Sequence, residues 1–334
     1  METIKIGSTG LVSSRIGLGT WAIGGWMWGG TDESESIQTI HKALDEGITL
    51  IDTAPVYGFG RSEEIVGKAL AEGGRRQRAI LATKAGMDWT EGENVYRNAS
   101  RERIMKEVED SLRRLQTDVI DIHQVHWPDP HVPIEETAEA MYRLHRDGKI
   151  RAIGVSNFNP EQLDRFRDAA PLETLQPPYN LFEREIEEDI LPHAREKGLT
   201  TLTYGSLCRG LLSGKMSKNR SFKRDDLRQA DPKLQEPRFG SYLKAVEELD
   251  KWVQARYGKR VIHLALRWVL DHPGVGVALW GARRPEQLDP VPEIDDWNLT
   301  DEDRVDIETI LDRNLTDPVG PGFMAPPSRD GRTA

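Results

Sequence analysis

Cys208 is the only cysteine among the 334 residues, which excludes a disulfide within the chain and favours a reducing compartment, the cytoplasm. No apolar run approaches the length of a membrane span, and residues 1–7 lack the apolar core of a signal peptide. The net charge of −10 argues against a nucleic-acid surface. We therefore expect a soluble, cytoplasmic protein that binds neither a membrane nor nucleic acid, and we expect no bound metal.

A further absence concerns the fold. No Gly-x-Gly-x-x-Gly follows any apolar run, which argues against a doubly wound sheet with a dinucleotide fingerprint. Short apolar runs instead alternate with helical patterns, which predicts a parallel sheet, and eight such units close a barrel. The eight runs cover residues 16–20, 48–53, 79–84, 119–125, 151–155, 173–176, 199–204 and 275–280. We predict an α/β fold, a (β/α)8 TIM barrel that forms one domain over residues 1–334.

The expected helices lie between these runs. The first is capped by Asp32 or Ser34, and the others cover residues 62–72, 100–115, 134–147, 160–169, 185–197 and 241–257, with 260–271 as an additional helix. Three segments fall outside the alternation: an N-terminal hairpin over 4–15, a long loop over 207–240 after the seventh strand, and a proline-rich tail over 312–334. The loop is a candidate for function because of its length. We expect the irregular tail to lie over the barrel mouth.

Polar side chains end three neighbouring strands. Because side chains alternate along a strand, Asp52 shares a face with Leu50, Lys84 with Ala82, and His126 with Gln124 and Ile122, whereas His123 faces the other way. Asp52, Lys84 and His126 should therefore point inward at the chemical face of the barrel, with Tyr57 just above them. A structural Asp–Lys pair, a core histidine and a surface tyrosine are the alternatives. Convergence of four polar groups on one mouth favours a site.

These residue types suit proton transfer to a carbonyl oxygen. Tyrosine has a pKa of about 10, and a nearby ammonium such as that of Lys84 would lower it. Asp52 would keep Lys84 charged, and His126 would orient the carbonyl by a hydrogen bond. None of these side chains is a strong electron donor, so reduction would need a hydride from a cofactor.

Candidate cofactor groups follow the last two strands, where barrels often bind phosphate. The seventh strand leads into Tyr204-Gly-Ser-Leu-Cys-Arg-Gly-Leu-Leu-Ser-Gly-Lys215, in which glycines allow backbone amides to approach a pyrophosphate. The eighth leads into Gly281-Ala-Arg-Arg-Pro285, and Pro285 suits the first turn of a helix. A solvated basic pair is the alternative for Arg283 and Arg284. Ser156, Asn157 and Gln176 offer hydroxyl and amide groups to a carboxamide.

The motifs together resemble the aldo-keto reductase superfamily. They are Asp52-Thr-Ala-x-x-Tyr57-Gly, Thr83-Lys84, His126-Trp-Pro, Gly154-Val-Ser-Asn-Phe158 and Gly281-Ala-Arg. Two longer strings, Thr20-Trp-Ala-Ile-Gly-Gly and Asp317-Pro-Val-Gly-Pro, resemble the bacterial general-stress-protein branch. The similarity runs from about residue 4 to 320.

The resemblance implies reversible NADP(H)-dependent reduction of aldehydes or ketones, with Tyr57 as acid–base and Asp52, Lys84 and His126 as its partners. It implies cofactor contacts from Thr20, Trp21, Asp52, Ser156, Asn157, Gln176, Tyr204, Gly205, Ser206, Leu207, Cys208, Arg209, Lys215, Arg228, Gly281, Ala282, Arg283 and Gln287. Many members carry an acidic residue and an asparagine where this chain has Pro290 and Val291. A weaker grip on adenine is therefore expected.

Five tryptophans suggest an apolar-walled substrate pocket: Trp21, Trp26, Trp28, Trp89 and Trp127. The substrate we expect is a small hydroxyaldehyde such as glyceraldehyde, with a polyol such as glycerol in the reverse direction. Two other functions compete with this one. The first is a lyase that uses Lys84 as a Schiff base. The second is a non-catalytic nicotinamide sensor or interaction subunit on the same scaffold.

Overall fold

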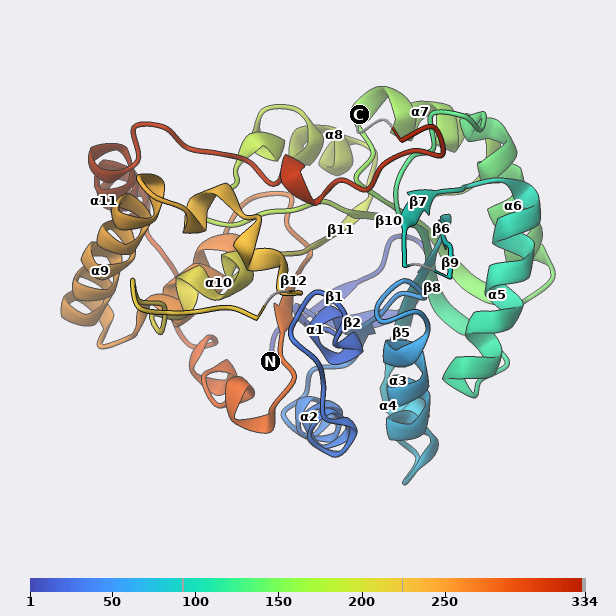
Figure 1. Ribbon diagram of the computed structural model, residues 1–334, viewed down its shortest axis with the longest axis horizontal. Helices are drawn as coiled ribbons and strands as arrows, with labels where there is room; N and C mark the ends of the chain where they lie inside the picture. The colour runs from blue at the N-terminus through green and yellow to red at the C-terminus, as the bar shows by residue number, and fades with distance from the viewer. Residues whose placement is uncertain (92, 224, 332–334) are drawn as a thin grey trace.

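Eight parallel strands close a barrel in the computed structural model, which describes residues 1–91, 93–223 and 225–331. In space they follow the order β10–β11–β12–β3–β4–β5–β8–β9, so the predicted (β/α)8 TIM barrel is confirmed (Figure 1). The strands are β3 (Ile16–Gly19), β4 (Leu50–Asp52), β5 (Ile80–Ala85), β8 (Ile120–Val125), β9 (Ile150–Ser156), β10 (Thr174–Gln176), β11 (Thr200–Thr203) and β12 (Val277–Gly281).

Helices cover the outside of the barrel (Figure 1). They are α2 (Glu33–Asp45), α3 (Arg61–Ala71), α5 (Arg101–Leu115), α6 (Ile134–Arg146), α7 (Pro160–Ala169), α8 (Ile190–Glu196), α9 (Arg238–Tyr257), α10 (Val261–Leu270) and α11 (Asp301–Asn314), with the single turns α1 (Trp21–Gly24) and α4 (Arg75–Arg78). Asp32 caps α2 by accepting from the backbone N–H of Glu35, as the sequence indicated.

Two hairpins accompany the barrel. The predicted N-terminal one pairs β1 (Thr3–Lys5) with β2 (Val12–Ser14) in antiparallel register. The other was not predicted: it pairs β6 (Met87–Trp89) with β7 (Val95–Arg97) inside what was expected to be a polar loop after β5. Each of these strands has three residues, and an alternation of apolar and polar side chains over three residues is too short to be recognised in the sequence.

The predicted helix over 185–197 is wrong in its first half. The chain forms a 3-10 turn, Glu185–Glu187, and only then α8. Pro192 explains the break, because proline has no N–H to donate to the carbonyl of residue 188 and is tolerated in the first turn of a helix rather than its interior.

The C-terminal part also differs from the prediction. α11 was not expected, and it continues to Asn314, so the irregular tail begins three residues later than residue 312. Thr300 starts this helix with a capping box in which Asp303 is the reciprocal partner. Beyond it the tail crosses the barrel mouth from the α11 side toward β7, with one 3-10 turn at Gly322–Met324 (Figure 1).

The barrel interior follows the predicted alternation. Leu50, Ala82 and Ile122 belong to one buried cluster with apolar side chains of the other strands. Lys84 and Gln124 are register partners above them, so they share this inward face. His123 points the other way and is fully buried, and burial lowers its pKa to about 4. The charged and amide side chains of the interior therefore lie at the C-terminal ends of the strands, above the apolar cluster.

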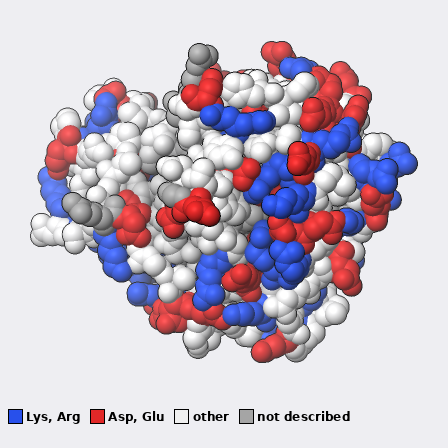
Figure 2. Space-filling view, turned by 45° about the vertical axis from the view of Figure 1, so that its right-hand side comes forward, with Lys and Arg blue, Asp and Glu red and all other residues white. Residues whose placement is uncertain are grey.

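The surface carries both signs of charge interspersed, without a broad field of one sign on the face seen in Figure 2. Among the described residues, no helix is long and apolar enough to cross a membrane.

Gly67 marks a close contact between α3 and α5, since a Cβ there would lie 2.4 Å from the carbonyl oxygen of Arg114 on α5. Gly67→Ala should therefore force α3 and α5 apart and destabilise the fold by roughly 1–3 kcal/mol, measured from the midpoint of denaturant unfolding. Gly240→Ala in α9 is the control, because its nearest neighbour would lie 3.6 Å away and alanine favours the helix. An unchanged midpoint for Gly67→Ala would contradict the close contact.

Candidate active site

A buried ion pair lies at the C-terminal ends of β4 and β5. Lys84 Nζ donates to Asp52 Oδ2 at 2.7 Å and to the carbonyl oxygen of Thr53 at 3.0 Å. The Lys84 side chain is fully buried and that of Asp52 nearly so. Burial lowers the pKa of Lys84, while the neighbouring Asp52 acts in the opposite direction. The sequence predicted this pair from strand parity.

Two amides complete the surroundings of the carboxylate. Gln176 Nε2 donates to Asp52 Oδ1 at 2.9 Å, and Gln124 Nε2 donates to the same oxygen at 3.3 Å. Gln176 was expected to hold a carboxamide, and Gln124 was not expected in the site. Four strands of the barrel are thus tied to one carboxylate, which orients the Lys84 ammonium.

Tyr57 lies directly above this network. Its ring is 5.1 Å from Lys84 Nζ, stacks on Trp21 at a centroid distance of 5.8 Å, and meets the His126 ring edge-on at 5.8 Å. The predicted convergence of Asp52, Tyr57, Lys84 and His126 is therefore observed in space. Their catalytic roles stay predictions.

The expected lowering of the Tyr57 pKa is wrong for this site. Burial raises the pKa of Tyr57 well above 10, and the charge of Asp52 adds to that effect. The prediction considered the charge of the Lys84 ammonium and left out the burial of the phenol, which is the largest cause of the shift. With its pKa raised in this way, the Tyr57 phenol keeps its proton at neutral pH and can donate it.

His126 is also neutral. Burial lowers its pKa well below 6.5, and the charge of Lys84 lowers it further. The backbone N–H of His126 donates to the carbonyl of Ala85, and its carbonyl accepts from Asn157 Nδ2 at 3.0 Å, so the loop position is fixed on both sides. A neutral imidazole keeps one N–H that can donate to a carbonyl oxygen.

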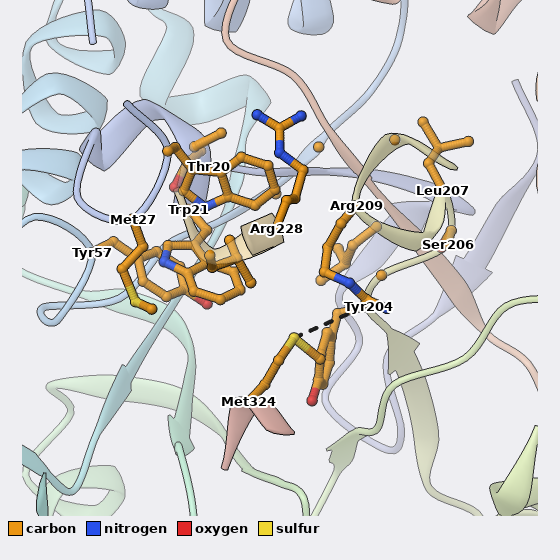
Figure 3. A pocket seen from close by; sticks show the side chains of 18 of the residues that line it. Thr20, Trp21, Met27, Tyr57, Tyr204, Ser206, Leu207, Arg209, Arg228 and Met324 are labelled. Atoms are coloured by element: carbon orange, nitrogen blue, oxygen red, sulfur yellow. Dashed lines mark hydrogen bonds between the residues drawn. The ribbon is translucent and has the colours of Figure 1, made fainter. Parts of the chain in front are cut away.

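A cavity of about 600 Å³ opens above these groups. In Figure 3, Trp21, Met27 and Tyr57 lie on one side of it, and Tyr204, Ser206, Leu207 and Arg209 on the other. Most residues with a predicted role line the cavity: Thr20, Trp21, Trp26, Trp28, Asp52, Tyr57, His126, Trp127, Ser156, Asn157, Gln176, Tyr204, Gly205, Ser206, Leu207, Arg209, Lys215, Arg228, Gly281, Ala282, Arg283 and Gln287.

Three predicted site residues do not line it. Lys84 lies beneath the floor. Cys208 is buried behind the wall, and burial raises the pKa of its thiol to about 12. Trp89 packs on Phe59 and under the guanidinium of Arg103 and does not line the cavity, so it is not a pocket tryptophan.

Arg209 reaches the cavity but is already bound. Its guanidinium donates to Glu183, and its Nε donates to Asp231 at 2.6 Å, with Lys233 paired to Glu183 at 2.7 Å. All four charged side chains are buried. In Figure 3 Arg209 also reaches Met324, whose sulfur accepts at 3.8 Å. Arg209 is thus a support for the tail and the loop after β11 and has no free donor pair for a pyrophosphate.

A second cavity of about 470 Å³ lies beside the first. It is lined by the basic residues Arg220, Lys223, Arg228, Arg283 and Arg284 and by the acidic residues Asp32, Glu35 and Asp226, and Arg228 Nε donates to Asp226 Oδ1 at 2.8 Å. Burial lowers the pKa of Arg283, and the neighbouring charges of Arg228 and Arg284 lower it further. Arg283 Nη1 donates to the carbonyls of Trp28 at 2.7 Å and Gly30 at 3.1 Å. A bound anion would offset this crowding of positive charge.

The expected helix at Pro285 is only a four-residue 3-10 turn, Pro285–Leu288. A helix dipole therefore adds little to Arg283. Arg220 and Lys223 were not predicted as site residues. The recurrence of basic residues along the loop after β11 was the feature of the sequence that could have indicated them.

The cavity has groups that fit a nicotinamide dinucleotide. Ser206 Oγ lines it, is buried, and has no hydrogen-bond partner among the described residues. Gly205 and Gly210 expose backbone there with φ of 74° and 92°. Tyr204 forms a wall, with its hydroxyl donating to Asn157 Oδ1 at 2.9 Å. The Tyr204 ring, the unpaired Ser206 hydroxyl and three arginines, Arg220, Arg228 and Arg283, all line the first cavity.

Apolar residues from two segments complete the end near Tyr57. Met87 and Val95 come from the β6–β7 hairpin, and the tail supplies Phe323, Met324, Ala325, Pro326 and Pro327. The tail was expected over the mouth, but its individual contacts were not predicted, because its sequence has no period.

This barrel, with its polar strand ends, is of the kind that carries oxidoreductase chemistry. A model of the Aldo/keto reductase family matches residues 15–312. The chain belongs to this family, as the motifs indicated.

Two relatives match over most of their length. The chain is 64% identical over 330 residues to aldo-keto reductase YhdN of Bacillus subtilis strain 168, covering 99% of both chains. It is 37% identical over 319 residues to the NADH-specific methylglyoxal reductase of Escherichia coli K12, covering 91% of this chain and 96% of the relative.

Solved structures agree. The glycerol dehydrogenase AKR11B4 of Gluconobacter oxydans is 55% identical with a TM-score of 0.88, covering 97% of this chain and 99% of that one. An aldo/keto reductase of Klebsiella pneumoniae, solved with NADP and acetate, is 30% identical with a TM-score of 0.70, covering 92% and 94%. The chain is therefore similar to proteins named for either nicotinamide cofactor.

Proposed function

We propose that this protein is an NADP(H)-dependent enzyme that reversibly reduces aldehydes or ketones in the cytoplasm, with Tyr57 as the proton donor and acceptor. The observation that carries the proposal is the stack of Tyr57 between Trp21 and His126, directly over the Lys84–Asp52 ion pair, at the floor of the cavity. A neutral phenol beside a neutral imidazole is the protonation state that carbonyl reduction needs.

A nicotinamide cofactor, when bound, would supply the hydride for the carbonyl carbon. The residues handle the proton: Tyr57 gives its phenolic proton to the carbonyl oxygen, while the His126 N–H orients that oxygen. As the phenolate develops, the Lys84 ammonium, 5.1 Å from the ring, stabilises the negative charge. Asp52 keeps that ammonium charged and in position. In the reverse direction Tyr57 takes the alcohol proton.

The residues that would hold the cofactor fall into two groups. Tyr204, Asn157 and Ser206 would contact the nicotinamide end and the pyrophosphate. Arg283, Arg228 and Arg220 would receive the 2′-phosphate, because their mutual repulsion is relieved by a dianion. The charge of this cluster favours NADP(H), although one relative is named NADH-specific.

For the substrate we propose a small hydroxyaldehyde such as glyceraldehyde, with a polyol such as glycerol in the reverse direction. Support comes from the names of two similar proteins, a glycerol dehydrogenase and a methylglyoxal reductase. A panel of carbonyls with NADPH and NADH, followed by absorbance, tests both cofactor and substrate. A Schiff-base lyase is disfavoured because Lys84 Nζ is buried in its ion pair. Turnover in the panel would exclude the non-catalytic sensor.

Tyr57→Phe should lower the rate of carbonyl reduction by about 100- to 10,000-fold, since the proton donor is lost with little change in volume. NADPH affinity, measured by fluorescence titration, should stay within a few fold of the parent value. A reduction rate within tenfold of the parent rate would refute the assignment of Tyr57.

Lys84→Met should move the pH profile of alcohol oxidation to higher pH. In that direction Tyr57 must accept a proton, and its pKa, already raised by burial, rises further when the nearby cation is gone. The profile of log kcat against pH measures the shift. Lys68→Met, which removes an exposed lysine paired with Glu33, is the control and should leave the profile unchanged. If the two variants share one profile, Lys84 serves only the fold.

Arg283→Ala should weaken NADPH binding by about 10- to 150-fold, the equivalent of roughly 1.5–3 kcal/mol for a charge-assisted hydrogen bond. NADH affinity should change little, because it lacks the 2′-phosphate. Arg313→Ala, which removes an exposed arginine paired with Glu248, controls for net charge. Equal losses for the two cofactors would mean that Arg283 acts by holding the carbonyls of Trp28 and Gly30 rather than by reading the phosphate.

A further inference from the structure

Arg97, the last residue of β7, joins three walls of the cavity without lining the cavity itself. Its Nε donates to the carbonyl of Pro326 at 3.0 Å, and its backbone N–H donates to the carbonyl of Pro327 at 3.0 Å. Its Nη1 donates to the carbonyl of Pro128 at 3.3 Å, and its guanidinium lies 5.1 Å from the centre of the Trp127 ring.

The joined segments all face the end of the cavity near Tyr57. Pro326 and Pro327 belong to the tail, and Trp127 follows His126 directly in the chain. Arg97 is also the register partner of Met87 in the hairpin, which contributes another part of the wall. One guanidinium therefore holds the tail, the loop after β8 and the hairpin in a single arrangement.

The surroundings of Arg97 are unusual for a buried cation. It is 3% exposed, and it forms no ion pair with any carboxylate in the described part of the chain. Its hydrogen-bond acceptors are backbone carbonyls, and its Nη2 has no partner among the described residues. Burial lowers the pKa of Arg97 although the charge of Asp129 acts in the opposite direction, so placing a guanidinium there with only carbonyls as hydrogen-bond acceptors is costly. The planar, forked donor set suits the task of holding carbonyls from separate loops at fixed angles.

We propose that Arg97 is a positioning residue that sets the shape of the substrate end of the cavity by clamping the tail against the Trp127 loop. The inference rests on the proposed function, since it concerns the carbonyl substrate of that site. Arg97 touches neither the cofactor side of the cavity nor Tyr57. Its removal should therefore change how the substrate is held more than how the cofactor binds.

The test uses Arg97→Met, which keeps the apolar stem and removes the donors. The KM for a small hydroxyaldehyde should rise about tenfold or more, with a smaller fall in kcat and a dissociation constant for NADPH within twofold of the parent value. Amide hydrogen exchange in peptides covering residues 315–331 should become faster, because the carbonyl of Pro326 in the tail loses its hydrogen bond from the Arg97 guanidinium.

Arg184→Met is the matched control. Arg184 lies 5.2 Å from the centre of the Trp268 ring and pairs with Glu187 and Glu308, all outside the cavity. The Arg184→Met variant should have a lower melting temperature, with KM and the rate of amide hydrogen exchange in the tail unchanged. An Arg97→Met enzyme whose KM and tail exchange match those of Arg184→Met would overturn the proposal.

Arg97→Lys covers the case in which the methionine variant does not fold. It keeps a buried cation and one or two of the hydrogen bonds, so KM and tail exchange should fall between those of the parent and Arg97→Met. Parent-like values for this variant and for any folded Arg97→Met would count against clamping by the forked guanidinium. The two proposals fail differently: a parent enzyme without carbonyl turnover refutes the proposed function, whereas an active parent with insensitive Arg97 variants refutes only the positioning role.

Discussion

The buried ion pair between Asp52 and Lys84 is the interaction on which the rest of the site depends. Two opposite charges without water are stable only when their other hydrogen-bonding positions are filled, and removing one partner costs about 3–5 kcal/mol. Here Gln176, Gln124 and the carbonyl of Thr53 fill those positions. Because the donors and acceptors come from β4, β5, β8 and β10, the carboxylate also fixes the relative heights of four strand ends.

Above the ion pair the walls of the cavity consist of loops. Hydrogen bonds from cationic side chains to backbone carbonyls hold these loops in place. Loops lack ladder partners for many of their carbonyls, and those carbonyls must still be satisfied. Cationic side chains take this role repeatedly: Arg283 on Trp28 and Gly30, Lys223 on Gly29, and Lys233 on Gly320. Arg97 on Pro326 and Pro128 is the same device at the substrate end. The floor is therefore set by the barrel, and the walls by a few cations.

This division explains how much could be predicted from the sequence. Strand parity predicted the inward direction of Asp52 and Lys84, and helical spacing predicted most of the helices, because both depend on short-range periodicity. The Arg209 cluster was not predictable, since its carboxylates come from residues 183 and 231 and meet only in the fold. The pKa of Tyr57 was predicted in the wrong direction, because burial cannot be read from the residue types near it in the chain.

The difference between the barrel floor and the loop walls also concerns the choice between NADP(H) and NAD(H). Proteins similar to this chain are named for NADH in one case and were solved with NADP in another, although all share the barrel. Discrimination must therefore come from the walls, as is common when one fold serves several ligands. In this chain Arg220, Arg228 and Arg283 line the same cavity. Burial lowers the pKa of Arg283, and the charges of Arg228, Arg284 and Arg220 lower it further, while Asp226 acts in the opposite direction. A dianion there would offset the positive charge of the arginines and accept hydrogen bonds in which both partners are charged. A ribose hydroxyl carries no charge and would not offset it. On the proposed function, these arginines from the loops after β11 and β12, rather than any feature of the barrel, would favour NADP(H) over NAD(H).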